Sequence, residues 1–206
     1  MANSGGKARL YLRALDERES KPISGTEGAY DPFFAPDGES IGFAARGKLK
    51  KVSLADGNVV DVGDAPTLRG AAFTPRGTIV FAPTSHGGLW AVPAGGGQPV
   101  EVTRLDLGTG ENSHRWPEVL PDGKTVIFTI RRGGSFDNAL VAAVDLESGQ
   151  RRALIEGGTF AQYASTGHLH RGVRRGHLDP RSRARRAEPL HAGERKYPRR
   201  LASQRS

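Results

Sequence analysis

The sequence contains no cysteine among its 206 residues. This absence excludes a disulfide framework, thiolate metal ligands and a cysteine nucleophile. Long apolar runs are missing as well. No segment approaches the length of a membrane-spanning helix, and no run of signal-peptide length follows residues 1–7. We therefore expect a chain without a signal peptide or membrane segment, cytoplasmic by default and periplasmic if it belongs to a larger exported protein.

Acidic residues are scarce in one region, and this scarcity explains the formal net charge of +8. Residues 168–206 contain 12 Lys and Arg but only 3 Asp and Glu, a net charge of +9. Residues 1–167 contain 18 basic and 19 acidic residues, a net charge of −1. The alkaline character therefore belongs to the C-terminal segment, and the body of the chain is electrically balanced.

Glycine and proline are abundant, with 28 and 13 residues, whereas hydrophobic residues make up 36% of the chain. This composition favours many short strands joined by tight turns and disfavours a helical bundle.

A repeated turn motif organises the body of the chain. Its copies are Phe34-Ala35-Pro36-Asp37-Gly38, Phe73-Thr74-Pro75-Arg76-Gly77, Leu120-Pro121-Asp122-Gly123 and a weaker Tyr163-Ala164-Ser165-Thr166-Gly167. Proline fixes φ, aspartate bonds nearby amides and glycine accepts positive φ, so each copy predicts a hairpin turn. The turn glycines are spaced by 39, 46 and 44 residues, which is the period of a β-propeller blade.

Each repeat also has room for four short strands. After the hairpins, strand-like runs follow at 49–54 and 59–62, at 89–92 and 99–105, and at 140–146 and 151–155. We predict an all-β fold: a partial β-propeller of about three four-stranded antiparallel blades with partial blades on both sides. A generic antiparallel sandwich is the alternative. The expected units are 1–28 (outer strands of a preceding partial blade), 29–66, 67–110, 111–158, 159–169 (the start of a fourth blade) and 170–206, an arginine-rich tail that we expect to be disordered.

The turn motif and the isoleucine and phenylalanine that follow it resemble the WD40-like repeat of TolB-like propellers. Residues 10–16, 25–29, 47–52 and 113–117 are also similar to propellers that follow the kinase domain in bacterial serine/threonine protein kinases. The resemblance covers roughly residues 7–169 and implies a propeller fragment of a larger sensor protein. No kinase motif and no Gly-x-Ser-x-Gly elbow of a hydrolase occurs in the sequence.

The sequence departs from this resemblance after residue 169, where the strand pattern gives way to an arginine-rich composition. The change falls in the middle of a blade. One hypothesis is that residues from about 170 are a frameshifted reading, which translation of the underlying DNA in the other two frames would test.

His114, Arg115 and Trp116 are the candidate contacts for a ligand or partner, because they open the third unit near the expected central channel. The alternative is that they pack between blades, with His114 bonded to a neighbouring loop. The charged segment 131–137 is expected to be a solvated loop or a partner contact. Asp37 and Asp122 are interpreted as turn residues, and we expect no catalytic residues, metal or cofactor.

The function indicated by the sequence is a non-enzymatic binding scaffold for a protein or small ligand. The expected partners are a protein or the missing propeller blades. One alternative is a propeller that accompanies an enzyme, such as a hydrolase or peptidase, whose catalytic domain lies outside this chain. The other is nonspecific nucleic-acid binding through 170–206, which carries most of the positive charge.

Overall fold

A computed structural model describes residues 2–4 and 7–172. Segment 173–206 lies outside the described residues. The expected disorder of the tail and most of the segment in the frameshift hypothesis therefore fall outside them too. The described part is all β apart from one short 3-10 turn, η1 (Leu107–Thr109). It contains no helix long and apolar enough to cross a membrane.

Three four-stranded antiparallel sheets confirm the predicted fold class. In each sheet the strands follow one another in sequence order, so every connection is a hairpin. The first sheet contains β5 (Tyr30–Phe34), β6 (Ser40–Ala45), β7 (Lys48–Ser53) and β8 (Val59–Asp64). The second contains β9 (Ala71–Phe73), β10 (Thr78–Phe81), β11 (Trp90–Pro93) and β12 (Val100–Glu101). The third contains β13 (Glu111–Val119), β14 (Thr125–Arg132), β15 (Leu140–Asp145) and β16 (Arg151–Glu156).

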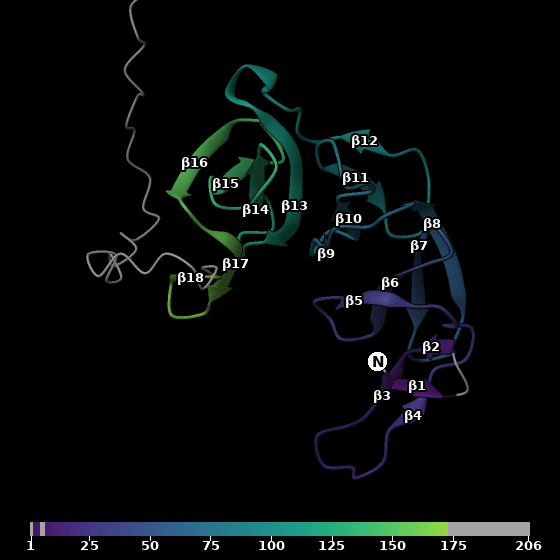
Figure 1. Cartoon of the computed structure of the whole chain (residues 1–206). Helices are drawn as coiled ribbons and strands as arrows, with labels where there is room; N and C mark the ends of the chain where they lie inside the picture. Colours follow the sequence, from purple (N-terminus) through teal and green to yellow (C-terminus); the bar gives the residue numbers. More distant parts are fainter. Residues whose placement is uncertain (1, 5–6, 173–206) are drawn as a thin grey trace, which may run out of the picture.

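Two-stranded sheets flank these three. On one side β3 (Tyr11–Leu12) pairs with β4 (Lys21–Pro22), and on the other β17 (Thr159–Ala164) pairs with β18 (His168–Gly172). A further hairpin joins β1 (Ala2–Ser4) to β2 (Lys7–Arg9). The sheets stand around an arc that is open on one side (Figure 1). The first strands of the larger sheets and β17 lie on the concave side, where β5 contacts β9 and β13 contacts both β9 and β17.

The corners of the repeat are the hairpins between the first and second strands. All four corner glycines have positive φ, for example 74° at Gly38 and 71° at Gly123. The Asp122 carboxylate accepts hydrogen bonds from the amides of Lys124 (3.0 Å) and Thr125 (2.8 Å), and Asp37 accepts one from Glu39 (2.8 Å). These aspartates stabilise turns, as interpreted from the sequence.

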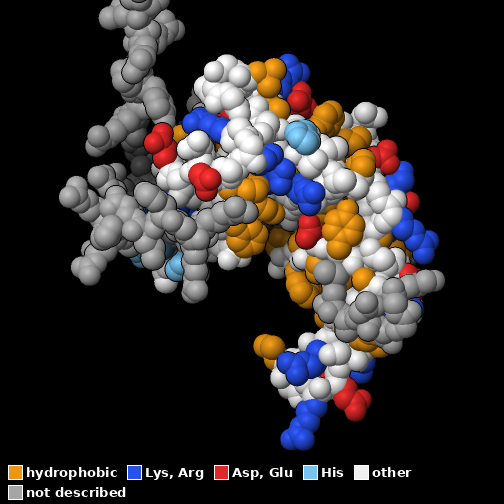
Figure 2. Space-filling model, viewed as in Figure 1, with side chains coloured by type: hydrophobic (Ala, Val, Ile, Leu, Met, Phe, Trp, Pro, Cys, Tyr) orange, Lys and Arg blue, Asp and Glu red, His pale blue; other side chains and the backbone are white. Residues whose placement is uncertain are grey.

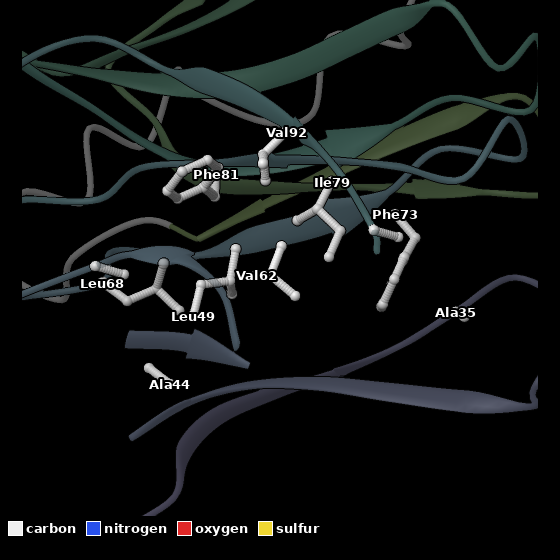
Figure 3. Close-up of a cluster of buried hydrophobic side chains, with 11 residues drawn as sticks. Ala35, Ala44, Leu49, Val62, Leu68, Phe73, Ile79, Phe81 and Val92 are labelled. Carbon is white, nitrogen blue, oxygen red and sulfur yellow. The ribbon is translucent and has the colours of Figure 1, made fainter. Parts of the chain in front are cut away.

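The core lies between the sheets and not within a single layer. Along β10, Ile79 and Phe81 pack toward the first sheet, whereas Val80 packs toward the third. Leu49 and Val62 of the first sheet face Ile79 and Phe81 across the interface (Figure 3). A central strand covered on both faces needs a continuous apolar run, which the sequence Ile79-Val80-Phe81 supplies.

Two boundaries differ from the sequence-based expectation. The strand expected at 99–105 is limited to Val100–Glu101, because the Thr103 side chain turns inward to accept a hydrogen bond from Leu89 N. The last hairpin runs to Gly172, three residues beyond the expected boundary at 169. Its backbone pairs Gln162 with His170, and such pairing does not require an apolar side-chain pattern.

Candidate ligand-binding site on the inner strands

The four inner strands carry the same backbone irregularity. Positive φ values occur at Asp31 (48°), Gly70 (99°), Trp116 (50°) and Phe160 (50°). Each of these residues lies seven positions before the corner glycine of its own repeat. The strand register shifts at or beside three of them, in β5, β13 and β17, as expected of β-bulges. Bulges redirect side chains and left-handed non-glycine residues carry strain, so this position is a candidate site.

At Gly70 the irregularity brings two blades into close contact. Trp116 N donates a hydrogen bond to Arg69 O (2.8 Å). A Cβ at position 70 would lie 2.7 Å from Trp116 Cα, so only glycine fits there. The start of β9 is thereby fixed against the middle of β13.

Trp116 is the centre of an aromatic group drawn from three elements. Its ring stacks on Phe136 of the β14–β15 loop at a centroid distance of 5.4 Å and an interplanar angle of 29°. Phe160 of β17 meets it edge-on at 5.8 Å. Phe160 is 49% exposed, so part of this aromatic surface faces solvent.

Two arginines contact the aromatic group, and the charge of a third, Arg69, acts on one of them. The guanidinium groups of Arg115 and Arg131 lie 5.3 and 5.4 Å from the Phe136 ring centre, within cation–π range. Arg115 Nε donates to Ser113 Oγ and its Nη2 donates to Ser85 O, both at 2.8 Å. We call Arg69, Arg115, Trp116, Arg131, Phe136 and Phe160 the inner-rim cluster. Figure 2 shows blue basic side chains beside orange hydrophobic ones near the concave edge of the arc.

Positive charge dominates the electrostatics of the inner-rim cluster. Burial lowers the pKa of Arg115, and the positive charges of Arg69 and Arg131 lower it further. Partial burial raises the pKa of Asp31, while the positive charge of Arg69 acts in the opposite direction. Among the described residues, no carboxylate oxygen lies within 4 Å of a guanidinium nitrogen of the three clustered arginines.

His114 lies inside the protein, next to the inner-rim cluster but not on its surface. Its ring is 0% exposed and packs on Phe128 at 5.0 Å. His114 Nδ1 lies 2.7 Å from Thr103 Oγ1, and Nε2 lies 3.0 Å from Glu111 Oε2. Thr103 Oγ1 accepts from Leu89 N, which leaves its own proton available to Nδ1, and this arrangement fits a neutral ring with its proton on Nε2.

The burial of His114 favours this neutral form. Arg151 Nη1 donates to Glu111 Oε2 at 2.7 Å and lies 3.2 Å from His114 Nε2. Burial lowers the pKa of His114; Glu111 opposes this effect and Arg151 adds to it. Burial alone would raise the pKa of Glu111, but hydrogen bonds from Asp106 N, Arg151 and His114 outweigh it and lower the pKa.

The threonine of this network has a counterpart elsewhere in the repeat. Thr26 Oγ1 accepts a hydrogen bond from Leu10 N at 3.1 Å, just as Thr103 Oγ1 accepts one from Leu89 N at 2.8 Å. Both threonines follow the fourth strand of their unit and bind the residue just before the third. Thr26 donates its proton to Ile23 O (2.7 Å) instead of a histidine. The threonine therefore acts as a structural clamp in both places.

The three candidate residues from the sequence thus occupy two environments. Arg115 and Trp116 belong to the inner-rim cluster, whereas His114 belongs to the buried network beside it. Sequence reasoning missed Arg69, Phe136 and Phe160 as neighbours. The constant seven-residue offset from the corner glycine was a usable signal for Phe160. No group of His, Asp and Glu side chains in the described ranges could hold a metal ion.

Comparison with solved structures agrees with this architecture. A protein assigned as TolB from Agrobacterium tumefaciens superposes with a TM-score of 0.63 at 18% identity over 76% of this chain. TolB from Acinetobacter baumannii gives 0.65 at 20% identity over 84%. A protein assigned as a gluconolactonase gives 0.55 at 17% identity over 83%.

These likenesses establish the TolB-like β-propeller fold. The chain spans 61%, 45% and 61% of the lengths of these three structures, in the same order. No protein-family model and no curated protein sequence matches the chain. At such identities the likeness shows the fold alone, so function has to be argued from the site.

Proposed function

We propose that this chain is a non-enzymatic recognition module and that a protein ligand contacts Arg115 and Trp116. The inner-rim cluster is the observation that carries the proposal, because it gathers arginine and aromatic side chains from two blades and a hairpin on one partly exposed surface. Arginine and tryptophan are among the residues that most often dominate the binding energy of protein interfaces. His114 acts as a positioning residue that holds the start of β13.

The alternative is an enzyme or a propeller that accompanies one. Glu111, His114 and Thr103 contain the acid, imidazole and hydroxyl of a hydrolase triad. However, Thr103 is 5% exposed and its hydroxyl oxygen accepts a hydrogen bond from Leu89 N, which holds it as part of the packing between strands. This geometry supports a structural clamp between blades in preference to a catalytic site.

The resemblance seen in the sequence supports a place for this module in a larger TolB-like or kinase-associated sensor protein. Nonspecific nucleic-acid binding through 170–206 is the third proposal, and it concerns residues that lie almost wholly outside the described ranges.

The proposed function is tested by selecting random displayed peptides on the full chain. Selected peptides should bind the wild type and lose binding to Arg115→Ala and Trp116→Ala. They should keep it for Arg104→Ala, which removes an arginine paired with Glu101 on β12, and for Phe34→Ala, which removes a 60% exposed aromatic of β5. Equal binding to all four variants would contradict the proposed site, and failure to enrich any peptide would contradict the function.

A further inference from the structure

We propose that the inner-rim cluster recognises an acidic peptide, whose carboxylates meet Arg69, Arg115 and Arg131 and whose apolar side chain meets Trp116 and Phe160. This inference rests on the proposed function and adds the chemical class of the ligand. Three observations carry it: the three arginines have no carboxylate partner, an aromatic surface adjoins them, and the site is open.

The partners of the clustered arginines orient them without neutralising them. Arg115 binds a serine hydroxyl and a backbone carbonyl, and Arg131 Nη2 binds Gly134 O. The Nε atoms of Arg69 and Arg131 are buried and have no hydrogen-bond partner among the described residues. The hydrogen bonds of these side chains thus leave their positive charge uncompensated.

Several other basic side chains of the described part do have carboxylate partners. Lys48 pairs with Asp64, Lys50 with Asp61, Arg76 with Glu147 and Arg151 with Glu111. Holding three guanidinium groups together without carboxylates costs electrostatic free energy, which an anionic ligand would offset. The positive charge of Arg69 also acts on the Asp31 carboxylate, which lies beyond ion-pair distance.

The guanidinium group selects the kind of anion. Its planar set of donors matches a carboxylate or phosphate through two parallel hydrogen bonds. Arg115 and Arg131 both lie over the Phe136 ring. Trp116 stacks on Phe136 and also contacts the exposed ring of Phe160, so the aromatic surface extends away from the arginines. The ligand therefore needs an oxyanion next to an apolar group, as in a peptide that contains glutamate and phenylalanine.

The shape of the site favours a peptide over a small molecule. Small-molecule sites enclose most of their ligand. Two cavities of the described part, of about 340 and 280 Å³, are lined by other residues, such as Glu101 and Arg151 in one and Trp90 and Pro99 in the other. The inner-rim cluster lies on neither, so it suits an extended chain.

A peptide is also favoured over a nucleic acid. Single-stranded nucleic acid requires a positively charged groove that follows several phosphates. Here the arginines form one compact group beside Asp31, and residues 1–167 have a net charge of −1. A ligand with a few carboxylates fits this distribution better than a polyanion.

The test is fluorescence anisotropy with the full chain and three labelled peptides that alternate phenylalanine with glutamate, glutamine or lysine. The glutamate peptide should bind at least about tenfold more tightly than the glutamine peptide, and high salt should weaken its binding. Arg115→Ala and Arg131→Ala should each weaken binding by about tenfold, whereas Arg104→Ala should not. Arg115→Lys should recover only part of the affinity, because lysine lacks the planar fork.

Segment 170–206 is basic and can also attract acidic peptides, but it is the same in every variant. Differences in binding between the variants therefore report on the inner-rim cluster alone. Equal loss of binding in Arg104→Ala and Arg115→Ala would overturn the proposal, as would stronger competition by inorganic phosphate or a thymidine oligonucleotide than by unlabelled glutamate peptide. Equal binding of the glutamine and glutamate peptides, still lost in Trp116→Ala, would overturn the acidic class but keep the proposed function. Binding of none of the peptides would contradict both.

Discussion

The buried His114 network predicts a specific dependence of stability on pH. In the folded chain burial and Arg151 lower the pKa of His114, so the unfolded chain binds the proton more tightly. The stabilising contribution of the neutral ring is therefore fully present above the ordinary histidine pKa of about 6.5 and is lost as pH falls toward the lower folded pKa. The slope should approach ~1.4 kcal/mol per pH unit below about pH 6.

His114→Gln removes this titration. The variant should also lose about 1–3 kcal/mol at pH 7.5, because the ring packing on Phe128 and at least one hydrogen bond, to Thr103 or to Glu111, are lost. Urea unfolding between pH 7.5 and 5.5 measures both effects. His86→Gln, in the exposed β10–β11 loop, is the matched control for loss of a histidine.

The expected result is that the difference in unfolding free energy between control and His114→Gln shrinks as pH falls. A constant difference across this range would refute the reasoning, because it would mean that His114 does not titrate differently in the folded and unfolded chains.

Two further substitutions, each with a control, test the packing between blades. Gly70→Ala should lower the free energy of unfolding by about 2–5 kcal/mol, because position 70 has positive φ and a Cβ there would meet the Trp116 backbone. Its control, Gly38→Ala, has positive φ but nothing within 4 Å and should lower it by about 1 kcal/mol in urea unfolding. Phe128→Ala should cost about 3–5 kcal/mol because the ring is 1% exposed, and Phe34→Ala should stay within about 0.5 kcal/mol in the same assay.

The fold was predictable because its main signals are local. Each corner needs a residue with positive φ and a neighbour that bonds nearby amides, and Asp122-Gly123 satisfies both within two positions. The apolar run Ile79-Val80-Phe81 indicates burial on both faces without knowledge of its neighbours. Repetition of these signals at a blade-like period then predicts the arrangement around an axis.

The site was only partly predictable because it is assembled across the repeat. Arg115 and Trp116 were identified from their place at the start of an inner strand. Phe136 lies on a hairpin loop and Arg69 in another blade, and the sequence gives no sign that they meet. Likewise, Arg151 reaches Glu111 and His114 from the outer strand of the sheet, 40 and 37 residues away.

The central claim is that the concave surface around Trp116 is where a ligand binds, and tryptophan fluorescence tests it directly. The chain has two tryptophans, Trp90 on β11 and Trp116 on β13, so a Trp90→Phe variant reports on Trp116 alone. We predict that the glutamate–phenylalanine peptide changes the emission of this variant in a saturable way and leaves that of Trp116→Phe unchanged. A response seen only from Trp90 would contradict the account.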